Sequence, residues 1–422
     1  MTTTYPWPLM AAVVLLAAHT GATHAADAPA LSLNQAIERA LSAHPALRRS
    51  QLAQAASRQE RDGMNQATPW ALEVEVENFA GSGSVSGFSG AETTLGFSKL
   101  LERGDKRGRR TALGDANVNL LTVQDHGIRI RIASNAAKIF MAALAEQRRG
   151  QLVEASRALA ESIRAQVKRR VQVGRSAEAE LATAEIAVAR AKAAARRSTV
   201  TQAKQNQRLA AALAEDTPSF GQLLGDIESL PELDDLETLQ ARLDANPELA
   251  RLTQQQAIRT AELRLAEASQ RADLKLGAGV RQLAGPNDTA LVFSFSMPLG
   301  QSRRSAAGID AARSREQSAP LLRIERRLEL NAELFAIDAD LRAAADEYRM
   351  LSEEILPVAE KAVRLYQTGF ERGRYSLFEL SAAQRTLLEA QRDAINVAEQ
   401  YQLRFIALET ILGQVPGQGA SQ

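Results

Sequence analysis

Residues 174–195 read GRSAEAELATAEIAVARAKAAA, and residues 373–394 read GRYSLFELSAAQRTLLEAQRDA. Adding 199 to the numbers of the first stretch aligns the two, with identities that include the Gly-Arg pair and Glu180 with Glu379. Further upstream, residues 43–47 (AHPAL) recur as residues 245–249 (ANPEL), with an offset of 202. Because the period is roughly 200 residues, the chain is predicted to be a duplicated half-molecule and not an array of short repeats.

Long helical patterns surround this repeated stretch. They run from about 107 to 214 and from about 305 to 412, and each is broken once, near 173–176 and near 373–376. Each half is therefore predicted to form a helical hairpin. An arm of about 65 residues would be ~100 Å long at 1.5 Å per residue, which is too long for a compact domain, so such arms need lateral partners.

The packing seam of these arms follows from the spacing of apolar residues. Positions three and four residues apart form an a/d pattern typical of coiled coils. They are Leu380, Ala383, Leu387, Ala390, Ala394, Val397 and Tyr401 in the second half, and Leu181, Ala184, Val188, Ala191 and Ala195 in the first. A soluble coiled-coil spacer would explain the arms equally well.

The breaks in the helices carry residues suited to tight turns. Gly174 and Gly373 supply backbone freedom, and Ser176 and Ser376 are predicted to be the N-caps of the returning helices. Glu180 and Glu379 lie one turn inside those helices, where the helix dipole favours a carboxylate. That structural role alone would account for either glutamate.

Two short strand patterns lie in each half, between the helices. In residues 71–78 (ALEVEVEN) apolar and charged side chains alternate, and after a Gly/Ser-rich loop the pattern resumes at Leu95 and Phe97. The second half repeats this at 274–281 and 291–297, around the loop at 285–288. Each half is thus predicted to form one amphipathic β-hairpin.

These hairpins could cap an ordinary α+β domain. A membrane β-barrel explains them better, because strands of ~9–11 residues with an apolar outer face are what a barrel in lipid requires. Trp70, at the start of a strand, would suit an interfacial aromatic girdle. Four strands cannot close a barrel whose smallest form has eight, so several chains must share it.

Composition narrows the class further. Only 4% of residues are aromatic, and the net charge is +1 with both signs interspersed, which disfavours nucleic acid as a partner. An apolar run at 9–18 followed by small residues indicates a signal peptide, and it is too short for a spanning helix. The chain has no Cys, which excludes disulfides. Only two of its His residues, His44 and His126, lie beyond the predicted signal peptide, so few side chains of the types that bind transition metals are present. No catalytic motif stands out, so we expect no enzyme, no cofactor and no resident metal site.

Residues 366–385, YQTGFERGRYSLFELSAAQR, resemble the second periplasmic turn of the outer membrane efflux proteins, the TolC-like exit ducts of Gram-negative pumps. The similarity covers the whole mature chain. Residues 101–107, LERGDKR, resemble the Glu-x-Gly-Gly-Lys-Arg signature of the heavy-metal, CzcC-like branch, with Asp105 in place of the second Gly.

The resemblance implies a mainly α fold with a small β part. Long antiparallel coiled-coil hairpins would form an α-barrel, and four strands per chain would join a shared, trimeric 12-stranded transmembrane β-barrel. The expected divisions are a signal peptide (1–26), a first repeat (27–215, β-hairpin about 71–100), an equatorial linker (216–235), a second repeat (236–412, β-hairpin about 272–298) and a disordered tail (413–422).

The implied function is that of a passive outer membrane duct with a large periplasmic portion. It would serve a tripartite system, receiving substrate, heavy-metal cations by the branch, from a periplasmic adaptor and an inner-membrane RND pump. The implied aperture candidates are Glu379 and Glu180, although Ala382 replaces the next acidic position. The candidate adaptor contacts are the turn residues Gly174, Arg175, Ser176, Gly373, Arg374, Tyr375 and Ser376. The alternatives are a periplasmic coiled-coil adaptor and a duct for drugs.

Overall fold

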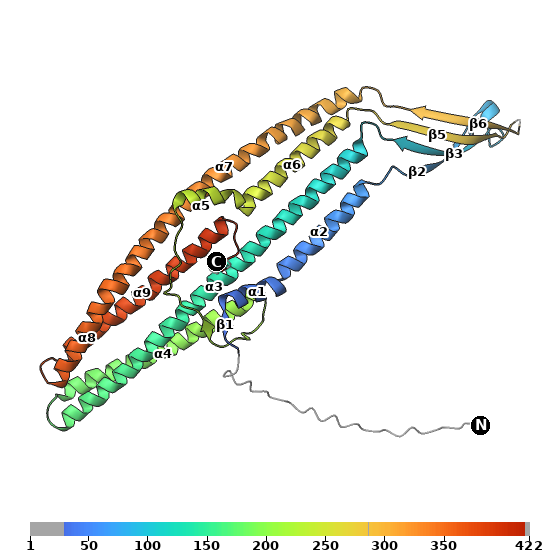
Figure 1. Cartoon of the computed structure of the whole chain (residues 1–422). Helices are drawn as coiled ribbons and strands as arrows, with labels where there is room; N and C mark the ends of the chain where they lie inside the picture. Colours follow the sequence, from blue (N-terminus) through green and yellow to red (C-terminus); the bar gives the residue numbers. More distant parts are fainter. Residues whose placement is uncertain (1–28, 286, 418–422) are drawn as a thin grey trace, which may run out of the picture.

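The structure, a computed structural model, describes residues 29–285 and 287–417. The predicted signal peptide lies outside the described residues. Long helices run side by side from two hairpin tips at one end to a small β-sheet at the other, as Figure 1 shows. The molecule is therefore a single elongated body in which the sheet and the tips are far apart.

The duplication is visible in the order of the elements. The first copy comprises β1 (Leu31–Ser32), α1 (Leu33–Ala43), α2 (Pro45–Met64), β2 (Trp70–Glu77), β3 (Glu92–Leu101), α3 (Lys106–Gln172) and α4 (Glu178–Ala212). After β4 (Leu223–Leu224), the second copy comprises α5 (Leu236–Arg242), α6 (Pro247–Ala268), β5 (Leu274–Leu283), β6 (Asp288–Ser296), α7 (Gln301–Arg349), a π-helix (Met350–Ile355), α8 (Leu356–Glu371) and α9 (Leu377–Ile411). Both halves contain the same elements in the same order, which are a helix, a β-hairpin, a long outgoing arm and a returning arm.

The AHPAL and ANPEL repeat marks the start of a helix in each copy. His44 accepts a hydrogen bond from the Ala46 N–H through Nδ1 (3.2 Å), and Asn246 accepts one from the Glu248 N–H (2.8 Å). A proline follows each cap at the first helical position, where its missing N–H costs nothing. The match between AHPAL and ANPEL is thus a helix-capping motif that occurs once in each half.

The helices form one layer, in which four helices lie side by side both near the sheet and near the tips. Near the sheet the neighbours are α2, α3, α6 and α7, and near the tips they are α4, α3, α9 and α7 continued by α8. The outgoing arms have the predicted length, since α3 has 67 residues. The returning arms α4 and α9 have only 35 each, because α2 and α6 fill the remaining length beside the outgoing arms.

Seven of the twelve predicted seam positions are confirmed as buried, and the other five (Leu181, Ala191, Ala195, Ala383 and Leu387) are half-buried. Ala184 and Val188 in α4, and Leu380, Ala390, Ala394, Val397 and Tyr401 in α9, are all buried. The largest core lies mid-way along the layer, where β1, β4 and residues around them cover α3, burying Phe140, Leu209 and Leu213. The Tyr401 hydroxyl donates to the Pro231 carbonyl, which ties the equatorial segment to α9.

The prediction of a disordered tail from residue 413 is wrong for residues 413–417. Gly413 ends α9 with φ 74°, and the Gln414 N–H then donates to the Glu409 carbonyl (2.8 Å). Val415 packs beside Ile37 and Ile406, so burial of this apolar side chain holds the segment against α1. Residues 418–422 lie outside the described residues.

Candidate functional site: the open-edged sheet and the hairpin tips

The sheet is four-stranded and antiparallel, in the order β2-β3-β5-β6. Leu72 pairs with Phe97, Phe97 with Ala278, and Ala278 with Phe293, so one row of apolar side chains crosses the whole face. The large side chains of this face are exposed: Leu72, Val74, Val76, Leu95, Phe97, Leu276, Val280, Leu291, Phe293 and Phe295. No described helix covers them, so the face is suited to lipid.

The opposite face is polar and internally paired. Arg281 donates to Glu92 (2.8 Å) and lies 2.9 Å from Glu77, while Lys275 pairs with Glu73. Acidic strand β2 and basic strand β5 are thus bridged across β3. Such a face suits the water-filled side of a barrel.

Two glycines explain how the central strands meet. Gly96 pairs with Gly279, and a Cβ on Gly279 would lie 2.7 Å from the Leu95 carbonyl oxygen and 2.9 Å from the Gly96 Cα. Because both obstacles are backbone atoms, no side-chain adjustment would relieve the clash. The strands approach closely here only because neither residue has a side chain.

The outer edges of β2 and β6 have no partner within the described chain. An open sheet edge in hydrocarbon would leave backbone N–H and C=O groups unsatisfied, at several kcal/mol each. The edges must therefore pair with strands of other chains if the sheet lies in lipid. None of the described helices has the length and apolar character needed to span a membrane.

The two tips at the other end have the same backbone. Gly174 (φ 72°) and Gly373 (φ 73°) are in the left-handed region, and the following residues, Arg175 and Arg374, each donate an N–H to a carbonyl five residues earlier (2.8 Å). This is the usual glycine-dependent helix C-cap. The seven predicted turn residues all lie at these tips, which Figure 1 places side by side.

The predicted N-caps are right in one tip and wrong in the other. Ser376 caps α9 in a capping box, accepting from the Glu379 N–H (3.3 Å). In α4 the cap is Ala177, without a side-chain bond, and the Ser176 hydroxyl is buried without a hydrogen-bond partner within the described chain. The offset of 199 explains the error, because Ser376 aligns with Ala177 and Ser176 with Tyr375.

The two aperture candidates have different surroundings. The Glu379 carboxylate accepts from the Ser376 N–H and hydroxyl (both 2.8 Å), and this backbone hydrogen bond is the main reason why its pKa lies below the usual range. Glu180 occupies the same helical position in α4 but forms no side-chain hydrogen bond within the described chain. Glu379 is thus ionised and structurally engaged, and its role in an aperture stays a prediction.

One contact at the tips had no counterpart in the sequence patterns. The Arg170 guanidinium donates to the Phe370 carbonyl and lies 4.6 Å from the centre of the Phe370 ring. It therefore joins the first helical hairpin to the second. Beside it, Tyr375 packs on Gly369, where a Cβ would come within 2.1 Å of the ring.

The tips carry more basic than acidic residues. Residues 168–180 contain Lys168, Arg169, Arg170 and Arg175 against Glu178 and Glu180, and residues 369–380 contain two of each sign. Within the described ranges no three His, Cys, Asp or Glu side chains are placed to hold a metal ion. His44 serves as a helix cap. Any preference for cations at the tips must therefore come from where individual carboxylates point.

The LERGDKR segment lies at the junction of the sheet and α3. Glu102 binds Arg110, whose guanidinium lowers the pKa of that carboxyl, and Lys106 binds Asp273 at 2.7 Å. Gly104 and Asp105 both have positive φ, of 79° and 60°. This geometry explains a Gly-Gly preference at these positions, and Asp is among the few other residues that tolerate it.

Comparison with known proteins agrees with this geometry. The family described as outer membrane efflux protein matches residues 238–414. The cobalt-zinc-cadmium resistance protein CzcC of Cupriavidus metallidurans is 24% identical over 314 residues, covering 74% of this chain and 75% of that protein. Residues 238–414 thus match the outer membrane efflux protein family, and the similarity to CzcC extends beyond them. The chain is an outer membrane protein with a large periplasmic portion.

The fold of this chain is shared with solved structures. A membrane protein from Pseudomonas aeruginosa superposes with a TM-score of 0.74 at 16% identity, covering 90% of each chain. CusC, described in a study of transmembrane channel formation, superposes with a TM-score of 0.72 at 16% identity, covering 90% of this chain and 92% of its own. The predicted combination of an α-barrel with a β-barrel is therefore confirmed.

Proposed function

We propose that three copies of this chain form one exit duct, in which the sheets close into a 12-stranded barrel and the helices form a periplasmic tunnel. The observation that carries this proposal is the four-stranded sheet with two free edges and an exposed apolar face. Trimerisation would pair β2 of one copy with β6 of the next. It would also satisfy every backbone group in lipid.

The proposed cargo is heavy-metal cations, because the CzcC relative is a cobalt-zinc-cadmium resistance protein. The duct would be passive, with no catalytic step and no cofactor. An inner-membrane RND pump would supply the driving force and the selection, and a periplasmic adaptor would connect the pump to the tips. Both hairpin tips, at residues 173–176 and 372–376, would contact the adaptor.

Glu379 and Glu180 would lie near the periplasmic aperture, where carboxylates favour cations and repel anions. Glu379→Gln tests this role cleanly, because Gln also suits the third position of a capping box. Planar-bilayer recordings on the purified protein should show reduced cation selectivity for Glu379→Gln. Unchanged conductance and selectivity would remove Glu379 from the aperture.

The cargo is tested by gene deletion and complementation. The deletion strain should become sensitive to zinc, cobalt or cadmium, and the wild-type gene should restore tolerance. Sensitivity to organic antibiotics with unchanged metal tolerance would favour the alternative, a drug duct. Recovery from the periplasm as a soluble protein, without heat-modifiable migration on gels, would favour the coiled-coil adaptor and contradict the duct.

A further inference from the structure

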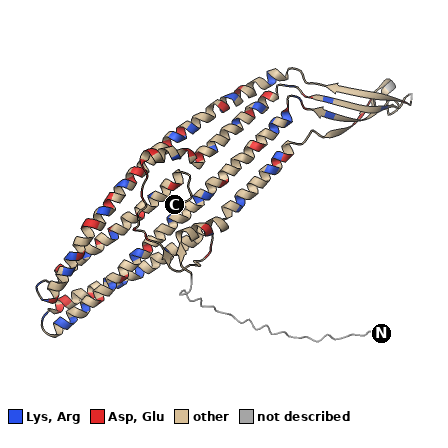
Figure 2. Ribbon diagram, in the orientation of Figure 1, with Lys and Arg blue, Asp and Glu red and all other residues tan. Residues whose placement is uncertain are grey.

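A belt of basic residues lies where the strands meet the helices. Residues 99–110 contain six basic residues (Lys99, Arg103, Lys106, Arg107, Arg109 and Arg110) and two acidic ones, although the chain as a whole has a net charge of +1. Arg271 follows α6, and Arg303 and Arg304 lie in the first turn of α7. These helix ends are neighbours in the layer, so the cations are grouped in space (Figure 2).

The depth of this belt is set by the apolar face of the sheet. Trp70 pairs with Lys99 at the helix-proximal end of β2 and β3, and the Lys99 ammonium lies 5.1 Å from the centre of the Trp70 ring. Tryptophan with a neighbouring lysine is typical of the boundary between hydrocarbon and headgroups. The belt therefore lies at the level of the headgroups of the periplasmic leaflet.

At least one cation of the belt lies on the side of the molecule that carries the apolar face of the sheet. The Arg103 guanidinium reaches the Met297 sulfur (3.9 Å), and Met297 continues the apolar row of Leu291, Phe293 and Phe295. Leu299, two residues further along, is 80% exposed. Arg103 thus lies directly beneath the lipid-facing side chains.

Most of these cations have no acidic partner. The acids of the junction are used by Lys106 (Asp273, 2.7 Å), Arg110 (Glu102) and Arg109 (Asp105, 3.6 Å). Lys99 lies over the Trp70 ring, and no carboxylate within the described chain lies within 4.0 Å of it or of the other five belt cations, which are Arg103, Arg107, Arg271, Arg303 and Arg304. These five arginines are all exposed.

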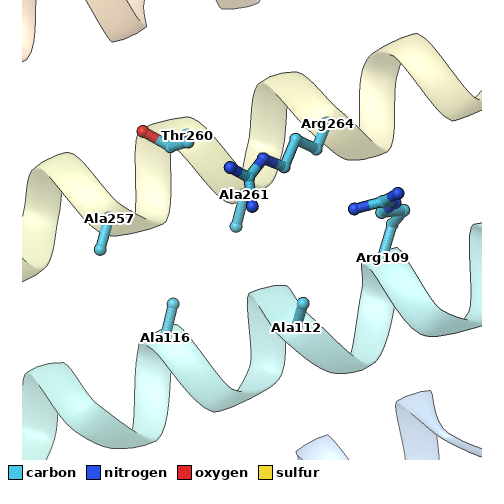
Figure 3. A pocket seen from close by; sticks show the side chains of 7 residues that line it. All are labelled: Arg109, Ala112, Ala116, Ala257, Thr260, Ala261 and Arg264. Carbon is cyan, nitrogen blue, oxygen red and sulfur yellow. The ribbon is translucent and has the colours of Figure 1, made fainter.

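Three of these arginines also lie at positions where a positive charge destabilises a helix. Arg107 lies in the first turn of α3, Arg303 and Arg304 lie in the first turn of α7, and neither turn contains an acidic residue. The positive end of a helix dipole disfavours cations and favours anions. Between α3 and α6, Arg109 and Arg264 both reach into the space between the helices, beside a cleft of about 280 Å³ lined mainly by alanines (Figure 3). An external anion would relieve the conflict at the helix N-termini.

We propose that this basic belt binds the headgroups of anionic phospholipids in the periplasmic leaflet of the outer membrane. Lysines and arginines beside an anionic membrane surface each strengthen binding, by roughly fivefold per residue. The phosphates would lie over the N-terminal ends of α3 and α7 and beside Arg103. The proposal uses the placement of the sheet in the membrane and is independent of the cargo.

The test compares a belt variant with a matched control in lipid nanodiscs. The belt variant is Arg107→Gln, Arg303→Gln and Arg304→Gln. The control is Arg190→Gln, Arg196→Gln and Arg197→Gln, three exposed arginines of α4 that lie far from the sheet and have no ion pair within the described chain. Both remove three positive charges. Phosphatidylglycerol bound per trimer is measured by native mass spectrometry, with phosphatidylcholine as the neutral lipid.

The belt variant should bind phosphatidylglycerol at least tenfold more weakly than wild type, and the control should bind it as wild type does. Added salt should weaken wild-type binding. Equal binding by belt variant and control, or no preference over phosphatidylcholine, would overturn the proposal. Displacement of the lipid by inorganic phosphate would show that the belt binds free phosphate instead, and would also overturn it.

Thermal unfolding supplies a second measurement, which does not rely on counting the bound lipid molecules. In phosphatidylcholine alone, the belt variant should unfold at or above the wild-type temperature, because it removes cations from two helix N-termini. In phosphatidylglycerol the order should reverse. The same order in both lipids would contradict the proposal, and the control variant should show no reversal.

Discussion

The contact between Arg170 and Phe370 should hold the two helical hairpins together at the tips. Its guanidinium donates to the Phe370 carbonyl and faces the ring at 4.6 Å, and the Phe370 side chain is only 1% exposed. A hydrogen bond from a charged group contributes about 1.5–3 kcal/mol, and a cation–π contact at a partly exposed site about 0.5–1 kcal/mol. Arg170→Ala should therefore cost roughly 2 kcal/mol of coupling between the hairpins.

A loss of that size should increase the population of separated tips roughly thirtyfold. Because the chain has no native Cys, spin labels can be attached at Arg175→Cys and Arg374→Cys, and the distance between them measured by pulsed electron resonance. Arg170→Ala should add or enlarge a population at longer distance. Conductance in planar bilayers should rise if the tips form the aperture.

The matched control is Arg169→Ala. Arg169 precedes Arg170 in α3, carries the same charge, is exposed and has no ion pair within the described chain. Its variant should keep the wild-type distance distribution, and Arg170→Lys should lie between wild type and Arg170→Ala, since lysine keeps the charge but loses the planar contact. Identical distributions for Arg170→Ala and Arg169→Ala would refute the reasoning.

Three further predictions concern single residues. Glu379→Ala should lower the temperature of thermal unfolding of the tips, while Glu379→Gln should not, since only alanine abolishes the capping box; equal effects would contradict the box. Burial raises the pKa of Glu409 to about 7 from 4.5, so the folded chain binds a proton at this carboxyl more tightly than the unfolded chain does. The contribution of protonated Glu409 to the free energy of unfolding is therefore lost as the pH rises through 7. Glu409→Gln should therefore add about 2 kcal/mol of stability at pH 8 and little at pH 4.5, by chemical unfolding, whereas a pH-independent effect would exclude this titration. Gly279→Val should abolish trimers on native gels through its clash with β3, while Gly308→Ala, whose Cβ meets nothing within 4 Å, should leave them intact.

Local patterns predicted the elements of this fold well. The alternation in residues 71–78 identified β2, and the Gly-Arg pairs located both tips, because each depends on a few neighbouring side chains. The single error in capping, at Ser176, arose because Ser176 matches Ser376 in residue type, whereas the 199-residue offset aligns Ser376 with Ala177. The repeat itself contained the correction.

Features that depend on distant residues could not be predicted in this way. Arg170 and Phe370 are 200 positions apart, and no pattern in the sequence pairs them. The pairing of β3 with β5 joins the two halves, and hairpin patterns define only neighbours within one half. The tail at 413–417 looked disordered by composition, yet Val415 finds an apolar site on α1 that only the folded molecule creates. Each of these is a tertiary contact without a local signal.

The central claim is that the free edges of β2 and β6 pair between copies in a closed ring of three. The Cys-free chain allows a direct test by introducing one cysteine on each edge strand, on the same polar face, in a small set of registers: Glu73→Cys or Glu75→Cys with Ala290→Cys, Val292→Cys or Ser294→Cys. After oxidation in membranes, at least one pair should give covalent trimers on denaturing gels, and each single-cysteine variant should give none. Absence of crosslinks in every register, or covalent products no larger than dimers, would contradict the shared barrel.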